Sequence, residues 1–137
     1  MVEIRPATDD DSAALARLTT QLGYPTTALQ MAARLARIGG MTLAAVLDGA
    51  VVAYVGVTLG QSYEYDDPYA RVTALVVDET ARRTGVGTSL MGAAETWART
   101  HGARAVVLNS AEHRSDAHAF YERLGYEDTG RRYVKAL

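Results

Sequence analysis

The sequence predicts an α/β fold, in which helices flank one central mixed sheet. Three observations support this class. Short, valine-rich apolar runs alternate along the chain with longer segments whose apolar residues recur every three or four positions. Asp48-Gly49 separates two of the short runs and indicates a tight hairpin. The chain has 137 residues and is 48% hydrophobic, which is enough for one domain with its own core, spanning residues 1–137.

The first half of the chain is expected to supply two helices and a hairpin. Thr8 is a good N-cap, and Asp11 follows it at the spacing of a capping box. Gly23 and Pro25 end the helix that begins there. In order, the expected elements are a strand over 2–5, helices over 8–22 and 28–38, and strands over 42–47 and 51–59.

The second half is expected to complete the sheet and to add two more helices. Val86, Leu90, Ala94 and Trp97 fall on one helical face, and Gly102 ends that helix. The expected elements are a loop over 60–69, a strand over 71–77, a helix over 86–101, a strand over 105–108, a helix from Ser115 or Asp116 to Leu124, and a closing strand pair at 126–127 and 132–136.

Composition excludes several classes of function. The chain has no cysteine, which removes disulfides, thiolate nucleophiles and the common zinc frameworks. Its three histidines lack metal-ligand spacing, so we expect no protein-bound metal. The formal net charge of −2 argues against nucleic acid as a partner. No apolar run is long enough for a membrane span, and residues 1–11 lack an export signal, so a cytoplasmic location is expected.

Residues 82–87, Arg-Arg-Thr-Gly-Val-Gly, lie between the end of a strand at Val77 and the start of a helix. Glycines at these positions let several backbone N–H groups point inward, where they and the positive end of the helix can hold an anion. Arg82 and Arg83 can add charge-assisted contacts to phosphate oxygens. The pattern is not a Walker A loop, because no Lys-Ser/Thr follows. The alternative is an ordinary glycine-rich turn with two solvated arginines.

A second motif follows at residues 117–126, Ala-His-Ala-Phe-Tyr-Glu-Arg-Leu-Gly-Tyr. With this motif after the 82–87 loop, the chain resembles the GNAT superfamily of acyl-CoA-dependent N-acetyltransferases. The resemblance extends over the whole chain and is most specific over residues 72–127. It implies a mostly antiparallel mixed sheet in which two parallel strands, 71–77 and 105–109, splay apart.

The resemblance implies that acetyl-CoA lies between the splayed strands, with its diphosphate on the 82–88 amides. A backbone N–H near Leu75 would stabilise the oxyanion, and Tyr121 would act as the general acid toward the departing thiolate. The alternatives are a core-packing Tyr121, a turn Asn109 and a solvated Arg114. The implied cofactor-binding residues are Leu75, Val76, Val77, Arg82, Arg83, Thr84, Gly85, Val86, Gly87, Thr88, Asn109, Arg114 and Tyr121.

The general base stays open. Many members of the family carry a glutamate on the strand before the phosphate loop, whereas residues 71–75 here contain no carboxylate. Without cysteine, direct attack by the amine in a ternary complex remains, and that amine must first lose a proton. The candidates are a water relay or one of the following side chains: Glu64, Asp66, Asp67, Glu112 and His113.

The loop at residues 63–69 packs three tyrosines and three carboxylates together. Such a surface favours a protonated amine through charge and cation–π contact. We therefore expect Tyr65, Asp66 and Asp67 to help bind the acceptor, a small amine or a lysine or N-terminal peptide. The alternative is a solvated loop that uses its tyrosines for dimer contacts.

The sequence thus predicts a GNAT-like N-acetyltransferase that forms a homodimer by analogy with the family. Two alternatives keep the fold: an acyl-CoA-binding regulatory module with weak catalysis, and a protein or peptide N-acetyltransferase. A third, nucleotide binding through Gly85 and Gly87, lacks the accompanying magnesium-binding pattern.

Overall fold

A computed structural model describes residues 2–109 and 115–137 of the chain. The chain divides into two compact units, Met1–Val107 and Leu108–Leu137. The first unit holds the sheet and three of the α-helices, and the second holds the last one, α4. No helix within the described ranges is both long enough and apolar enough to span a membrane.

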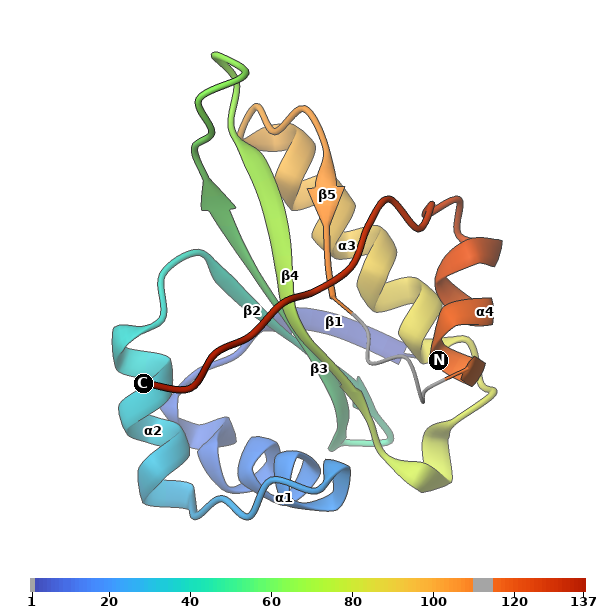
Figure 1. Ribbon diagram of the computed structural model, residues 1–137. Coiled ribbons are helices and arrows are strands. Elements are labelled where there is room, and N and C mark those ends of the chain that lie inside the picture. The colour runs from blue at the N-terminus through green and yellow to red at the C-terminus, as the bar shows by residue number, and fades with distance from the viewer. Residues whose placement is uncertain (1, 110–114) are drawn as a thin grey trace. The chain divides into compact units, whose positions relative to one another are not determined.

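The first unit is built on a five-stranded sheet with the strand order β1-β2-β3-β4-β5 (Figure 1). Consecutive strands pair antiparallel except β4 and β5, which are parallel. This mixed sheet with flanking helices confirms the predicted fold class. The strands are β1 Val2–Pro6, β2 Met41–Leu47, β3 Ala50–Gly60, β4 Tyr69–Val77 and β5 Val106–Val107. The α-helices are α1 Ser12–Leu22, α2 Ala28–Arg37, α3 Val86–Thr100 and α4 Ser115–Arg123, and the short 3-10 turns are η1 Asp9–Asp11 and η2 Glu79–Ala81.

Most local signals in the sequence fold as expected. Thr8 and Asp11 form the predicted capping box, although the first turn is the 3-10 turn η1 and α1 itself begins at Ser12. Asp48 and Gly49 have φ angles of 52° and 80°, the left-handed pair that a tight two-residue hairpin requires. The strand expected over 105–108 is shorter, because β5 contains only Val106 and Val107.

Helices cover both faces of the sheet (Figure 1). On one face α1 and α2 bury a cluster of side chains that includes Leu15, Leu18, Met31, Tyr54 and Val76. On the other face α3 buries Val86, Leu90, Met91, Ala94 and Ala98. Trp97 was expected on this buried face but is only half-buried, and its ring stacks on that of His101 at 4.3 Å between centroids.

The second unit does not contain the closing strand pair expected at 126–127 and 132–136, so that prediction is wrong. Residues 124–137 lie outside helices and strands, and Tyr133 and Val134 are exposed. A strand needs the backbone partners of a neighbouring strand, and alternation of side chains does not supply them.

A β-bulge shapes β4 where it leaves its parallel neighbour. Gly56 pairs with Ala74 while Val57 pairs with Val72, so Thr73 is an extra residue on β4. A bulge bends its strand and increases the local twist. β5 pairs with β4 only at Ala70 and Arg71, immediately before the bulge. The two parallel strands therefore share two positions and then no more.

The bulge explains why position 56 is glycine. A Cβ at Gly56 would lie 2.7 Å from the Thr73 hydroxyl oxygen, much closer than van der Waals contact. We predict that Gly56→Ala lowers the free energy of unfolding by about 1–3 kcal/mol through this overlap. Urea denaturation measures the change.

The matched background is Thr73→Ala, which removes the crowding oxygen. The double variant is expected to recover most of the loss caused by Gly56→Ala. Equal instability of the single and double variants would contradict the bulge contact as the cause.

Candidate functional site

Among the described residues, the backbone of β4 beyond Arg71 has a strand partner on one side only. The Asp78 N–H donates to the Val52 carbonyl of β3 at 2.8 Å. Because backbone groups alternate in direction along a strand, the N–H groups of Leu75 and Val77 point away from β3, toward the edge that β5 has left. Val76 lies between them with its side chain buried in the α1–α2 cluster. Leu75 and Val77 therefore present an open, strand-like backbone edge.

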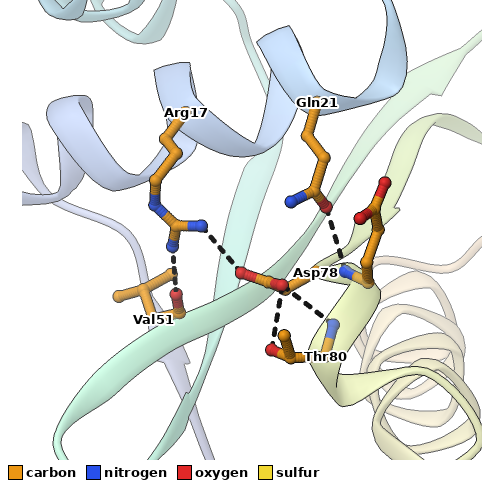
Figure 2. A network of polar contacts seen from close by, with 6 residues as sticks. Arg17, Gln21, Val51, Asp78 and Thr80 are labelled. Atoms are coloured by element: carbon orange, nitrogen blue, oxygen red, sulfur yellow. Dashed lines mark hydrogen bonds and ion pairs between the residues drawn. The ribbon is translucent and has the colours of Figure 1, made fainter.

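The polypeptide then turns through η2 into a loop fixed by Asp78. One Asp78 oxygen accepts bonds from the Thr80 N–H at 3.0 Å and from its hydroxyl at 2.9 Å, while the other pairs with the Arg17 guanidinium at 2.7 Å. Arg17 also donates to the Val51 carbonyl at 3.3 Å. The Gln21 side chain accepts from the N–H of Glu79 at 3.0 Å. Figure 2 shows how α1 holds the start of the loop through these contacts.

These contacts determine the ionisation of Asp78. The hydrogen bond from the Thr80 N–H is the largest cause, followed by the Arg17 guanidinium and the Thr80 hydroxyl, and together they lower the pKa of Asp78 to about 2. The carboxylate therefore stays ionised across the physiological range. It acts as a structural anchor of the loop and is unsuited to accept a proton during catalysis.

The 82–88 segment brings the expected anion-binding groups together at the end of β4. Gly85 has φ 85° and is the N-cap of α3, and no described side chain caps this helix end. The N–H groups of Val86, Gly87 and Thr88 lie in the first turn, where an α-helix leaves its amides unpaired. Arg83 also adopts a positive φ, 65°. This arrangement provides amides and positive charge for an oxyanion ligand such as a phosphate.

Side chains around this turn are arranged to match. Arg82, Arg83 and Thr88 are exposed, whereas Val86 is buried and attaches the helix to the sheet. The Thr84 hydroxyl donates to the Ala81 carbonyl and so closes the loop. Arg82 and Arg83 are thus exposed to solvent just before the helix begins, while the buried Val86 and the Thr84–Ala81 hydrogen bond fix the backbone of the loop.

Tyr121 and Asn109 belong to the second unit. The Tyr121 ring meets Phe120 edge-on at 5.2 Å and Tyr126 at 5.9 Å. Gly125, at φ 93°, ends α4, with N–H bonds from Gly125 to Glu122 and from Tyr126 to Tyr121. This is a Schellman ending, and the contact between Tyr126 and Tyr121 accompanies it. The Leu-Gly-Tyr motif therefore has a local structural role in orienting Tyr121.

Other predicted residues lie elsewhere. Glu112, His113 and Arg114 fall outside the described residues. Asn109 is exposed and lies two residues after the end of β5. In the described parts of the chain, no three histidine, aspartate or glutamate side chains are placed to share a metal ion.

The acidic loop at residues 63–69, between β3 and β4, lies at the opposite end of β4 from the 82–88 segment (Figure 1). Leu75 is six positions after Tyr69, which corresponds to roughly 20 Å along a strand. The Arg104 guanidinium lies 3.5 Å from the centre of the Tyr65 ring, and the Arg104 N–H donates to the Pro68 carbonyl at 2.9 Å. One face of the Tyr65 ring therefore already has a cation partner within the protein.

The sequence reasoning missed the anchor of the loop. Aspartate at a strand end with threonine two residues later is a known turn-forming pattern, so the Asp78–Thr80 contact had a local signal. Arg17 had none, since it is 61 residues away from Asp78.

Comparison with known proteins identifies relatives of the chain. The sequence profile of the Acetyltransferase (GNAT) family matches residues 12–126, which confirms the predicted family. An aminoglycoside N(6')-acetyltransferase type 1 from Stenotrophomonas maltophilia is 30% identical over 135 residues, covering 93% of this chain and 88% of the relative. An aminoalkylphosphonate N-acetyltransferase from Salmonella typhimurium is 32% identical over 93 residues, covering 68% of this chain but only 60% of the relative's length.

A solved structure shows the same fold at low sequence identity. The enzyme AAC(6')-Iy, in complex with the bisubstrate analogue CoA-S-monomethyl-acetylneamine, has a TM-score of 0.84 and 19% identity. The match covers 100% of this chain and 98% of that one. The likeness supports the fold class, and the ligand belongs to that enzyme.

The Asp78 anchor gives the protein a specific sensitivity to acid. A carboxyl group whose pKa is lowered on folding stabilises the folded state above its unfolded pKa of about 4, and the contribution disappears as the pH falls toward 2. We predict that Asp78→Asn is less stable than wild type at pH 6 and that the difference shrinks between pH 4 and pH 2. Urea denaturation at stepped pH measures it.

Asp66→Asn is the matched control, because Asp66 is an exposed carboxylate remote from this network. It should change stability little at any pH. A constant deficit for Asp78→Asn down to pH 2 would show that the charge of Asp78 is not what anchors the loop.

Proposed function

The chain belongs to the Acetyltransferase (GNAT) family, as the match over residues 12–126 shows, and we propose that it moves an acetyl group from acetyl-CoA to a primary amine. Relatives named for acetylating aminoglycosides and aminoalkylphosphonates support a small-molecule amine as the acceptor. The expected cytoplasmic location, homodimer and single domain over 1–137 stay predictions.

One observation carries the proposal: an open backbone edge on β4 leads directly into an uncapped helix terminus flanked by two exposed arginines. These groups fit acetyl-CoA in order. The diphosphate requires amides and positive charge, which residues 82–88 offer, and the amide-bearing pantetheine arm requires strand-like partners, which Leu75 and Val77 offer. The arm would add to β4 as an extra strand.

The residues of the chain then have separate tasks in direct transfer. Acetyl-CoA supplies the activated acetyl thioester. The N–H near Leu75 donates to the carbonyl oxygen as it gains negative charge, and this preorganised donor is the main electrostatic contribution. Tyr121 gives its phenolic proton to the departing thiolate. The carbon–nitrogen bond forms as the carbon–sulfur bond breaks, and the amine proton passes to water or to a base.

We predict that Gly85→Val weakens acetyl-CoA binding at least 10-fold in calorimetry. A valine Cβ at Gly85 meets no atom within 4 Å, so the change acts through the backbone: φ 85° is unfavourable for a β-branched residue, and relief of that strain reorients the amides.

Gly102→Val is the matched control. Gly102 has φ 78°, has equal free space and lies at the other end of α3. Both variants should lose similar stability, but only Gly85→Val should lose cofactor affinity. If well-folded wild-type protein takes up no acetyl-CoA, the proposed function itself fails.

We predict that Tyr121→Phe lowers kcat by about 10- to 100-fold and leaves the KM for acetyl-CoA nearly unchanged. The loss lies at the low end for general-acid catalysis, because a thiol with a pKa of about 8.5 is already a good leaving group. Thiol release in steady state measures both constants.

Tyr126→Phe is the matched control, since it removes the same hydroxyl from the neighbouring ring. It should keep wild-type kcat. Unchanged kcat in Tyr121→Phe would remove this side chain from the chemistry. Acetyl-CoA binding with no thiol release across a panel of amines would instead favour the binding-module alternative, which the absence of a carboxylate in residues 71–75 suggests.

A further inference from the structure

Arg34 occupies an unusual place on α2. It lies three residues after Met31, and positions three apart share a helical face. Met31 is buried in the cluster that contains Tyr54 and Val76, so Arg34 stands at the border of that cluster and is half-buried. By contrast Arg37, one turn later, is exposed. The Arg34 cation therefore lies at the border of the apolar cluster between α2 and the sheet.

The loop between α1 and α2 fixes the guanidinium. Arg34 donates to the Thr26 hydroxyl at 3.1 Å, and that hydroxyl donates in turn to the Tyr24 carbonyl at 2.7 Å. The Thr26 N–H donates to the Thr20 side chain at 2.9 Å. With its acceptor oriented from two sides, the Arg34 side chain is preorganised before any ligand arrives.

Arg34 has no carboxylate partner among residues 2–109 and 115–137. The ion pairs within these ranges join Arg5 to Asp11, Arg17 to Asp78 and Arg99 to Glu95. A guanidinium offers five N–H donors, and one is used here, by Thr26. A half-buried cation whose donors remain available favours an incoming anion, and its planar fork suits carboxylate and phosphate oxygens.

Arg34 borders the same cluster as Val76, which lies between Leu75 and Val77 on β4. Tyr54 lies directly opposite Val76 in the β3–β4 register, on the side of β4 away from its open edge, and both side chains are buried in the same cluster. Burial raises the pKa of Tyr54, the hydrogen bond with Thr19 opposes this, and the positive charge of Arg34 opposes it further. Arg34 on α2 therefore lies over the same face of the sheet as the Tyr54 phenol.

We propose that Arg34, supported by Thr26, binds an anionic group of the acceptor, which is therefore an amine that also carries a carboxylate, phosphonate or phosphate. The inference rests on the proposed function, since it concerns the second substrate of the same reaction. It differs from the cationic acceptor expected from the acidic loop, which lies at the far end of β4.

The experiment measures thiol release with acceptors that share an ethylamine core. 2-Aminoethylphosphonate, β-alanine and O-phosphoethanolamine carry an anionic group, and ethanolamine, which has the same amine but no anion, is the comparison. We expect wild type to prefer at least one anionic amine over ethanolamine by 10-fold or more in kcat/KM. Arg34→Gln should raise the KM for that acceptor by about 10- to 100-fold, the size of a lost charge-assisted hydrogen bond. Arg34→Lys should recover part of the loss, because it keeps the charge without the fork.

Arg37→Gln is the matched control, because it removes the same charge from the exposed side of the last turn of α2. It should behave as wild type. Equal KM increases for ethanolamine and the anionic amines in Arg34→Gln would show a structural role and overturn the proposal, as would a wild-type preference for ethanolamine. The relative rates of the three anionic amines distinguish carboxylate, phosphonate and phosphate. Absence of turnover with every amine, despite measurable acetyl-CoA binding, would contradict the proposed function instead.

Discussion

The backbone edge of β4 beyond Arg71, for which residues 2–109 and 115–137 supply no strand partner, is the constraint on which the proposed site depends. Buried or partly buried N–H and C=O groups need partners, and a strand edge without them attracts another extended chain. β5 satisfies that edge only as far as Arg71, and the bulge at Thr73 then turns β4 away. Leu75 and Val77 are left with groups that an extended, amide-containing ligand can satisfy. The start of α3 after Gly85 also offers unsatisfied hydrogen-bond donors, because the amides of its first turn have no intrahelical partners.

Helix α1 connects the two ends of the proposed site. Arg17 and Gln21 reach the loop that begins at Asp78, while Thr19 and Thr20 hold Tyr54 and the α1–α2 loop. The loop that begins at Asp78 and the Arg34 side chain are thus both positioned by contacts with α1. Attachment to one rigid helix keeps the groups of a site within a narrow range of geometry. Helix α1 contributes no side chain to the proposed chemistry, and its role is positional.

The sequence predicts local features well because the local chain determines them. The Asp48-Gly49 hairpin, the Thr8–Asp11 capping box and the start of α3 after Gly85 all depend on residues within one turn of each other. The features it misses depend on distant partners. No pattern links Arg17 to Asp78 across 61 residues, and the alternation at 132–136 cannot reveal whether a neighbouring strand is available. The half-buried position of Arg34 likewise follows from the packing of α2, whose Met31 is buried in the cluster with Tyr54 and Val76.

Charge and distance together decide which surface controls the acceptor. The acidic loop is attractive for an amine, but it is roughly 20 Å along β4 from Leu75. Two unit charges at that separation in water interact by about 0.2 kcal/mol, less than thermal energy, and salt screens most of the remainder. Such a loop can guide a cation toward the protein without holding it for reaction. Arg34 is instead placed on the border of the cluster that contains Tyr54 and Val76, on the face of the sheet that α1 and α2 cover. Direct attack also requires an uncharged nitrogen, so binding energy drawn from an anion elsewhere on the acceptor does not oppose the proton loss that the reaction needs.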